Sequence, residues 1–265
     1  VKKNIKNLNF IIFIKLTFKK SMIIKLIIII NSILNFSPLN VGLNNEKISL
    51  LVIYKTGGFI HKEGIEAGKK LFDHICNEKN YDCVISNEST YVNSKFLENI
   101  KVIVFLNTSG DILNNDEKIA MESFIKKGGG FIGIHSATDT EYDWDWYGKL
   151  VGAHFVNHPD IQTAKIFTQN KSFIVDHLKE EWEIKEEWYN FREINPNIKV
   201  LLSLDESSYE GGGNGSFHPI TWYHEFGGGK SFYTGLGHVG KTYDDTRFVK
   251  MIEKAILYTS GLVTK

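Results

Sequence analysis

Polar side chains follow several of the strands that the sequence predicts, and their types suit acid–base or metal chemistry. They are His61, Asn107, Asp111, His135, Asp139, Glu141 and His238. In open parallel sheets, ligands bind beyond the carboxyl ends of the strands, where loops concentrate function. Histidine can act there as general base, hydrogen-bond donor or metal ligand. We therefore expect catalytic roles for His61, His135, Asp139 and His238, and substrate contacts for Asn107, Asp111 and Glu141.

The segment Gly133-Ile134-His135-Ser136-Ala137 has small residues two positions before and after its histidine. Small neighbours allow a sharp turn from strand to helix, as in the nucleophile elbow of hydrolases. Here the elbow position holds His135, while Ser136 is offset by one residue and its side chain points elsewhere. This pattern favours a histidine base or ligand over a serine or thiol nucleophile.

Residues 142–147 (YDWDWY) combine four aromatic side chains with two acids. Aromatic faces and carboxylates together suit a carbohydrate surface, so Trp144 and Trp146 are candidates for sugar binding. The alternative is that these rings cap the core beneath the elbow. The pattern alone leaves both interpretations open.

Four later residues, His158, Glu187, Tyr189 and His218, are further candidates for substrate binding. His154 and His158 are four apart, which would suit chelation on a helix, although Pro159 argues against a helix there. His218 and His224 would share a face if both lay on one strand. Neither pair is a specific metal signature, and a structural role is the simpler interpretation for each histidine.

Alternating apolar runs and amphipathic stretches predict the elements that position these residues. We expect strands at 48–54, 82–85, 101–106 and 131–134, and helices at 63–78 and 116–126. Further strands are expected at 163–168, 188–192, 200–204, 220–225 and 231–236, followed by a helix at 245–258. This order predicts an α/β fold with a doubly wound, mainly parallel sheet flanked by helices, and extra strands in the C-terminal half. No linker divides residues 47–262, which we expect to form one domain.

Composition narrows the class of ligand. Lys plus Arg and Asp plus Glu each number 31, so the formal net charge is zero and no long-range field favours nucleic acid. The expected partner is a neutral or weakly charged small molecule. The glycine-rich segment 211–215 lacks the Lys-Ser/Thr of a phosphate loop, and we expect no nucleotide cofactor.

Residues 1–40 contain no acidic residue and carry an apolar run from Ile23 after Lys19 and Lys20. A basic flank before a short apolar run is typical of a signal peptide, which predicts a periplasmic or extracellular protein. A membrane tether or disordered tail is the alternative. Because the chain begins with Val, we expect Met22 to be the true start and residues 1–21 an upstream extension; the protein is cytoplasmic if the segment is a translation artefact.

The two cysteines, Cys76 and Cys83, match no common metal motif. Burial as free thiols is the default expectation. In an exported protein they could instead form a bridge.

Taken together, these segments resemble the ThuA-like (trehalose utilisation) family over residues 48–261. The resemblance rests on 58–61 (GFIH), 105–111 (FLNTSGD), 128–135 (GGGFIGIH), 139–142 (DTEY), 146–147 (WY), 150–153 (LVGA), 158–159 (HP), 187–191 (EWYNF), 218–220 (HPI), Trp222, 224–225 (HE) and 232–238 (FYTGLGH). Ser136 departs from the alanine expected there. The resemblance implies a fold similar to the class I glutamine amidotransferases. Those relatives carry cysteine at the elbow, so glutamine hydrolysis is not expected of a chain with His135.

The resemblance also implies a role in sugar catabolism, on a disaccharide or its 3-keto derivative, beside a dehydrogenase that forms 3-keto sugars. His135 could then act as base, with His238 or Asp139 as acid. A divalent metal could alternatively be held by some of His61, His135, Glu187 and His238. A non-catalytic carbohydrate-binding module, or a subunit of a sugar-catabolic complex, remains the alternative to an enzyme.

Overall fold

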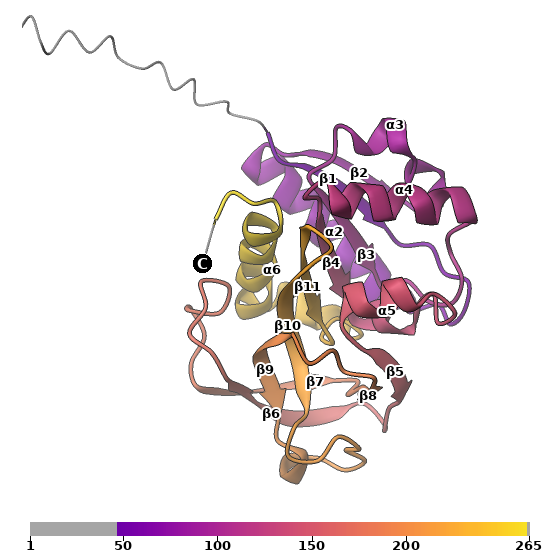
Figure 1. Cartoon of the computed structure of the whole chain (residues 1–265). Coiled ribbons are helices and arrows are strands. Elements are labelled where there is room, and N and C mark those ends of the chain that lie inside the picture. The colour runs from indigo at the N-terminus through magenta and orange to yellow at the C-terminus, as the bar shows by residue number, and fades with distance from the viewer. Residues whose placement is uncertain (1–46, 264–265) are drawn as a thin grey trace, which may run out of the picture. The chain divides into compact units, whose positions relative to one another are not determined.

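A nine-stranded mixed sheet runs through residues 47–263, the part of the chain that the computed structural model describes (Figure 1). Its strand order is β2-β1-β3-β4-β11-β10-β9-β6-β7. The parallel half comprises β2 (Asp82–Ser86), β1 (Ser49–Ile53), β3 (Val102–Leu106), β4 (Gly130–Ile134) and β11 (Gly229–Thr234). The antiparallel half adds β10 (Pro219–Phe226), β9 (Lys199–Leu204), β6 (Gln162–Thr168) and β7 (Glu181–Glu186). A separate pair joins β5 (His154–Asn157) to β8 (Asn190–Arg192).

Helices cover both faces of the parallel half, and this explains why β3 and β4 are apolar throughout and β1 is apolar after Ser49. The helices are α2 (Lys62–Lys79), α3 (Ser94–Leu97), α4 (Asn115–Lys126), α5 (Asp145–Val151) and α6 (Thr246–Thr259). Short 3₁₀ turns lie at η1 (Ser89–Tyr91), η2 (His135–Asp139), η3 (Glu206–Ser208) and η4 (Gly240–Asp244). In Figure 1, α6 lies on one side of the central strands β4 and β11, and α5 lies on the other. Every residue of β1, β3 and β4 is buried.

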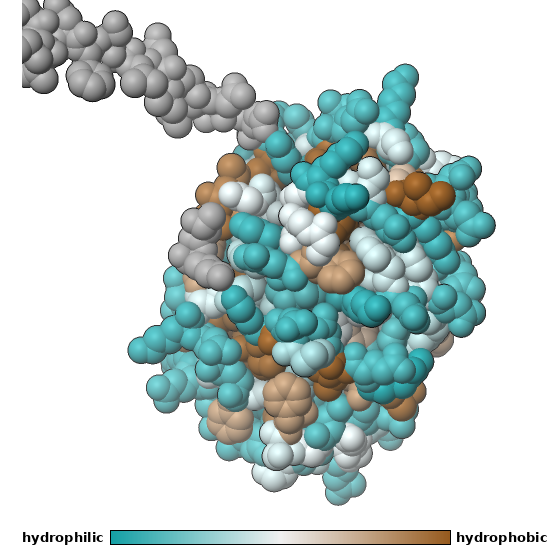
Figure 2. Space-filling model, viewed as in Figure 1, coloured by the Kyte–Doolittle hydropathy of each residue, from teal (hydrophilic) through white to brown (hydrophobic). Residues whose placement is uncertain are grey.

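The outer surface carries the polar residues. The face drawn in Figure 2 is mostly hydrophilic, with apolar groups scattered over it. Within residues 47–263, no helix combines the length and the apolar character that a bilayer crossing requires. The predicted signal peptide and the proposed start at Met22 lie outside the described residues.

The predicted α/β fold with its parallel half is confirmed, and two strands of the later half were not predicted. These are β5 and β7; β7 reads EWEIKE, and its Glu181, Glu183 and Lys185 are exposed while Trp182 and Glu186 are buried. His154 and His158 therefore lie in and just after a strand, so no helix brings them together, as Pro159 indicated. His218 precedes β10, whose register shifts between Pro219 and Trp222, and its partners differ from those of His224.

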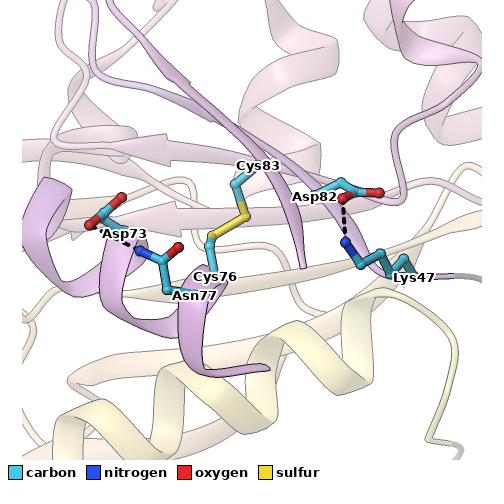
Figure 3. Close-up of a disulfide and its surroundings, with 6 residues drawn as sticks. All are labelled: Lys47, Asp73, Cys76, Asn77, Asp82 and Cys83. Carbon is cyan, nitrogen blue, oxygen red and sulfur yellow. Dashed lines mark hydrogen bonds and ion pairs between the residues drawn. A yellow bond between two sulfur atoms is a disulfide. The ribbon is translucent and has the colours of Figure 1, made fainter. Parts of the chain in front are cut away.

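A disulfide joins Cys76 to Cys83, so the bridge that the sequence left open is present and the default of burial without a bridge is wrong (Figure 3). Helix α2 ends at Lys79, and Asn80 adopts a left-handed conformation that reverses the chain. The backbone N–H of Tyr81 then donates to the carbonyl of Cys76. Strand β2 consequently starts beside the last turn of α2, with the two cysteine Cα atoms 6.2 Å apart.

Replacing both cysteines by alanine should lower the free energy of unfolding by about 2.5 kcal/mol, the chain-entropy value for a loop this short. Urea unfolding of the oxidised wild type and the double variant measures the difference. Wild type with a reductant serves as the control and should lose a similar amount. Equal midpoints for all three samples would show that the bridge does not stabilise the fold.

Candidate functional site

Four side chains from distant parts of the chain converge at the carboxyl ends of the parallel strands. They are His61, His135, Glu187 and His238, the set named above as metal candidates. One nitrogen or oxygen atom of each lies within 4.8 Å of the corresponding atoms of the others. The three histidines follow β1, β4 and β11, as the strand-end argument predicts, while Glu187 arrives from the end of β7. We call this set the histidine cluster.

The Glu187 carboxylate lies at the centre of the cluster. Its Oε2 is 2.9 Å from Nδ1 of His238, 3.2 Å from Nε2 of His135 and 3.9 Å from Nε2 of His61. Burial alone would raise the pKa of this carboxyl, but hydrogen bonds and the charges of His135 and His238 hold it well below its usual range. Glu187 is therefore a buried carboxylate anion whose compensation comes from imidazoles.

The backbone at His135 forms the sharp turn that the small neighbours predict. His135 has a φ of +50°, in the left-handed region, and the chain passes from β4 directly into η2. A Cβ on Gly133 would lie 3.0 Å from Cβ of Ala137, so a larger residue would disturb the turn. The turn aims the imidazole at Glu187.

Hydrogen bonding fixes which nitrogen of His135 faces the cluster. Its Nδ1 lies 2.9 Å from the carbonyl oxygen of Gly235, which can only accept, so Nδ1–H donates. Its Nε2 then faces Oε2 of Glu187 and Nδ1 of His238, each 3.2 Å away. A backbone carbonyl that holds the far N–H is the usual support of a metal-binding histidine.

His61 is held neutral. Burial, followed by the charges of His135 and His238, lowers the pKa of His61 to about 3. Its Nε2 lies 3.1 Å from the hydroxyl of Tyr189, while its buried Nδ1 has no hydrogen-bond partner among residues 47–263. The Tyr189 ring also contacts the ring of His135, with centroids 4.2 Å apart. Tyr189 thus lies in the wall of the site, where it was expected to bind substrate.

Glu186, which sequence reasoning did not select, positions the loop that carries His238. Its buried carboxylate accepts backbone N–H groups from Gly237, His238 and Val239 at 3.0–3.2 Å, and the hydroxyl of Thr242. Burial raises its pKa. The sequence contained a signal for this role in the pair Glu186-Glu187. Two adjacent acids at a strand end point to opposite sides, so they have different partners.

His158 and Asp139 flank the cluster on its more open side. The His158 side chain is 40% exposed, and its Nδ1 lies 3.2 Å from Oε1 of Glu187 and 2.9 Å from the carbonyl oxygen of Pro159. Because both partners accept, Nδ1 carries the proton, and in the neutral ring Nε2 has a lone pair. Asp139 accepts the hydroxyl of Tyr142, and burial raises the pKa of its carboxyl.

Three residues that were expected to contact substrate instead stabilise loops or face solvent. Asn107 donates to the carbonyl of Gly237 and to Tyr243, so it supports the His238 loop. Glu141 is buried and accepts the N–H groups of Ile112 and Leu113 while it pairs with Lys118. Asp111 is exposed on the same loop. Their polar groups already have structural partners, or face solvent.

The tryptophans also lie away from the cluster. Trp144 and Trp146 stack with centroids 5.0 Å apart, Trp144 stacks on Tyr147, and Trp146 packs on Phe226. This packing matches the second interpretation of residues 142–147, in which their rings cap the core.

His218 is buried behind the site. Its Nε2–H donates to the carbonyl of Tyr189, and its Nδ1 contacts Glu206 at 2.7 Å. It therefore supports the backbone beside Glu187.

The cluster has the donor set and spacing of a divalent-metal site. Two atoms that bind one ion at 2.0–2.1 Å lie about 3 Å apart, which the closest contacts here approach. Imidazole nitrogens with one carboxylate suit zinc and neighbouring transition metals. The Oε2 atom of Glu187, which faces all three histidines at 2.9–3.9 Å, fits the same interpretation. A bound ion would act as a Lewis acid on a substrate oxygen.

Comparison with known proteins agrees with the fold. Two solved ThuA-like proteins are similar: one from Bacteroides uniformis (21% identity, 80% of this chain and 91% of that one, TM-score 0.69) and one from Parabacteroides merdae (19%, 83% and 92%, 0.66). A β-galactosidase from Bacillus circulans matches over 82% of this chain and 31% of its own (14% identity, TM-score 0.53). No curated protein matched the sequence.

The family model described as ThuA, trehalose utilisation, matches residues 49–259. That range contains every element from β1 to α6 and all four residues of the histidine cluster. The resemblance drawn from the sequence is therefore confirmed, and the chain belongs to the ThuA (trehalose utilisation) family.

Proposed function

We propose that the chain is a metal-dependent enzyme of carbohydrate catabolism that cleaves or isomerises a disaccharide or its 3-keto derivative. The family description supports the sugar-catabolic role. The observation that carries the enzyme proposal is the convergence of three histidines on the buried Glu187 carboxylate. Buried, strongly perturbed titratable groups gather at catalytic sites more often than at structural ones.

The chemistry follows from a ketone at C3 of a sugar, which acidifies the neighbouring C–H bond. An ion held by the cluster would supply Lewis acidity at the ketone oxygen. Within the chain, His158 can take the proton at Nε2, because Glu187 and Pro159 hold its Nδ1–H. Asp139, whose raised pKa favours a protonated carboxyl, can assist departure of the glycosidic oxygen.

This assignment changes the roles expected from sequence. His135 was expected to be the base, but its Nε2 faces Glu187 and His238 inside the cluster, which suits a ligand. His238 likewise points at Glu187. Burial alone would lower the pKa of His238, but the Glu187 carboxylate raises it. The binding-module alternative rested on the tryptophans, and their packing against Tyr147 and Phe226 lends it no support.

We further propose that the protein acts in the periplasm or outside the cell, beside a dehydrogenase that supplies 3-keto sugars. The disulfide supports export, because such bridges persist in oxidising compartments.

Purified protein dialysed against zinc or another divalent ion should retain about one ion per chain, measured by mass spectrometry of the metal. His135→Ala should retain less than a tenth of that, since loss of one ligand weakens a four-ligand site severely. His74→Ala, which removes an exposed histidine from α2, is the matched control and should bind like wild type. Absence of metal from wild type under all these conditions would contradict the metal assignment.

Wild type should consume a 3-keto disaccharide, and His158→Gln should lower kcat at least about 100-fold, the usual minimum contribution of a positioned base. Metal content and thermal midpoint should stay unchanged in this variant. Product analysis by mass spectrometry separates cleavage from isomerisation. If wild type leaves both plain and 3-keto disaccharides untouched, the enzyme proposal fails.

A further inference from the structure

Two large apolar residues stand exposed directly before the first residue of the cluster. Phe59 is 67% exposed and Ile60 is 62% exposed, and His61 follows them in the loop between β1 and α2. Single exposed apolar residues are common on proteins and need no explanation. These two are distinctive because they adjoin a candidate metal ligand that is itself buried.

The Phe59 ring lies against the cluster. Its centroid is 4.8 Å from that of the His61 ring, and the two planes meet at 76°. The ring edge of one thus meets the face of the other, which leaves much of Phe59 open to solvent. A ligand that reaches the cluster along this side would pass over Phe59.

The backbone that carries Phe59 is firmly held. The carbonyl of Phe59 accepts the hydroxyl of Ser109 at 2.7 Å, and the N–H groups of Gly57 and Gly58 donate to the carbonyl of Ser109 at 2.6 and 3.2 Å. The facing loop is close: a Cβ on Gly110 would lie 2.7 Å from the nitrogen of Gly58. An exposed ring on a fixed backbone loses little freedom when a ligand binds, which favours affinity.

The other flank of the cluster offers a second aromatic and the polar groups. Phe155 packs on Tyr189, with ring centroids 4.1 Å apart, and lies 5.9 Å from the ring of His158. The next residue, Val156, is exposed. His158 and the half-buried Asp139, the proposed base and acid, lie at this side.

We propose that Phe59 is the platform on which the reacting sugar ring lies, with its C–H face on the aromatic ring and its reacting C–H bond and glycosidic oxygen toward His158 and Asp139. A pyranose has an apolar face of C–H groups and a rim of hydroxyls, and a site of few polar groups beside aromatic surface matches both. This inference rests on the proposed function and gives it a substrate orientation. It replaces Trp144 and Trp146, whose rings pack on the core, as the sugar-binding aromatics.

Phe59→Ala should raise the KM for a 3-keto disaccharide about tenfold, the effect of roughly one lost aromatic contact, with kcat changed less than about twofold. Trehalose binding measured by calorimetry should weaken by the same factor. Metal content should equal that of wild type, and Phe59→Trp should restore KM, because an indole also offers a flat apolar face.

Phe217→Ala is the matched control. Phe217 is 57% exposed and lines a groove that contains no residue of the histidine cluster. This variant should match wild type in KM, trehalose binding and metal content.

The outcomes separate the two proposals. Turnover by wild type with an unchanged KM in Phe59→Ala overturns the platform and leaves the enzyme proposal standing. Trehalose binding without turnover, weakened by Phe59→Ala, overturns the enzyme proposal and keeps the platform. A wild type that neither binds trehalose nor turns over a 3-keto disaccharide overturns both.

Discussion

The site depends on one constraint, which is that Glu187 buries a negative charge that must be compensated. An unpaired buried carboxylate costs several kcal/mol, and the cost falls only when donors or cations surround it. Here the surrounding groups are imidazoles from loops after β1, β4 and β11, with His158 on the remaining oxygen. Each of these loops is therefore held in place partly by its attraction to the same carboxylate.

Glu186 and Glu187 have identical side chains, but their environments give them different pKa values and different roles. Backbone N–H groups surround Glu186, and desolvation dominates, so its pKa is raised. Imidazoles surround Glu187, and its pKa is lowered. Adjacent acids with pKa values driven apart by their surroundings commonly have different tasks. Glu186 fixes the loop that presents His238, and Glu187 completes the cluster.

The parallel half of the fold and the three histidines of the cluster were predictable from local sequence. Continuous apolar runs mark β1, β3 and β4, and the topology of a parallel sheet brings the residues that follow them to one edge. Strand β7 was not predictable, because its outward positions are charged and mask the buried Trp182. The disulfide depends on the left-handed Asn80, and the inward stacking of Trp144 depends on Tyr147; both are tertiary outcomes.

Because of the sheet topology, the histidine cluster forms only in the completely folded domain. His61 lies at the start of the domain, His238 near its end, and Glu187 reaches them only after β7 has joined the far edge of the sheet. Contacts between residues so distant in sequence form late, because long loops must close first. Partly folded chains and proteolytic fragments would therefore carry the individual histidines without the convergence that forms the histidine cluster.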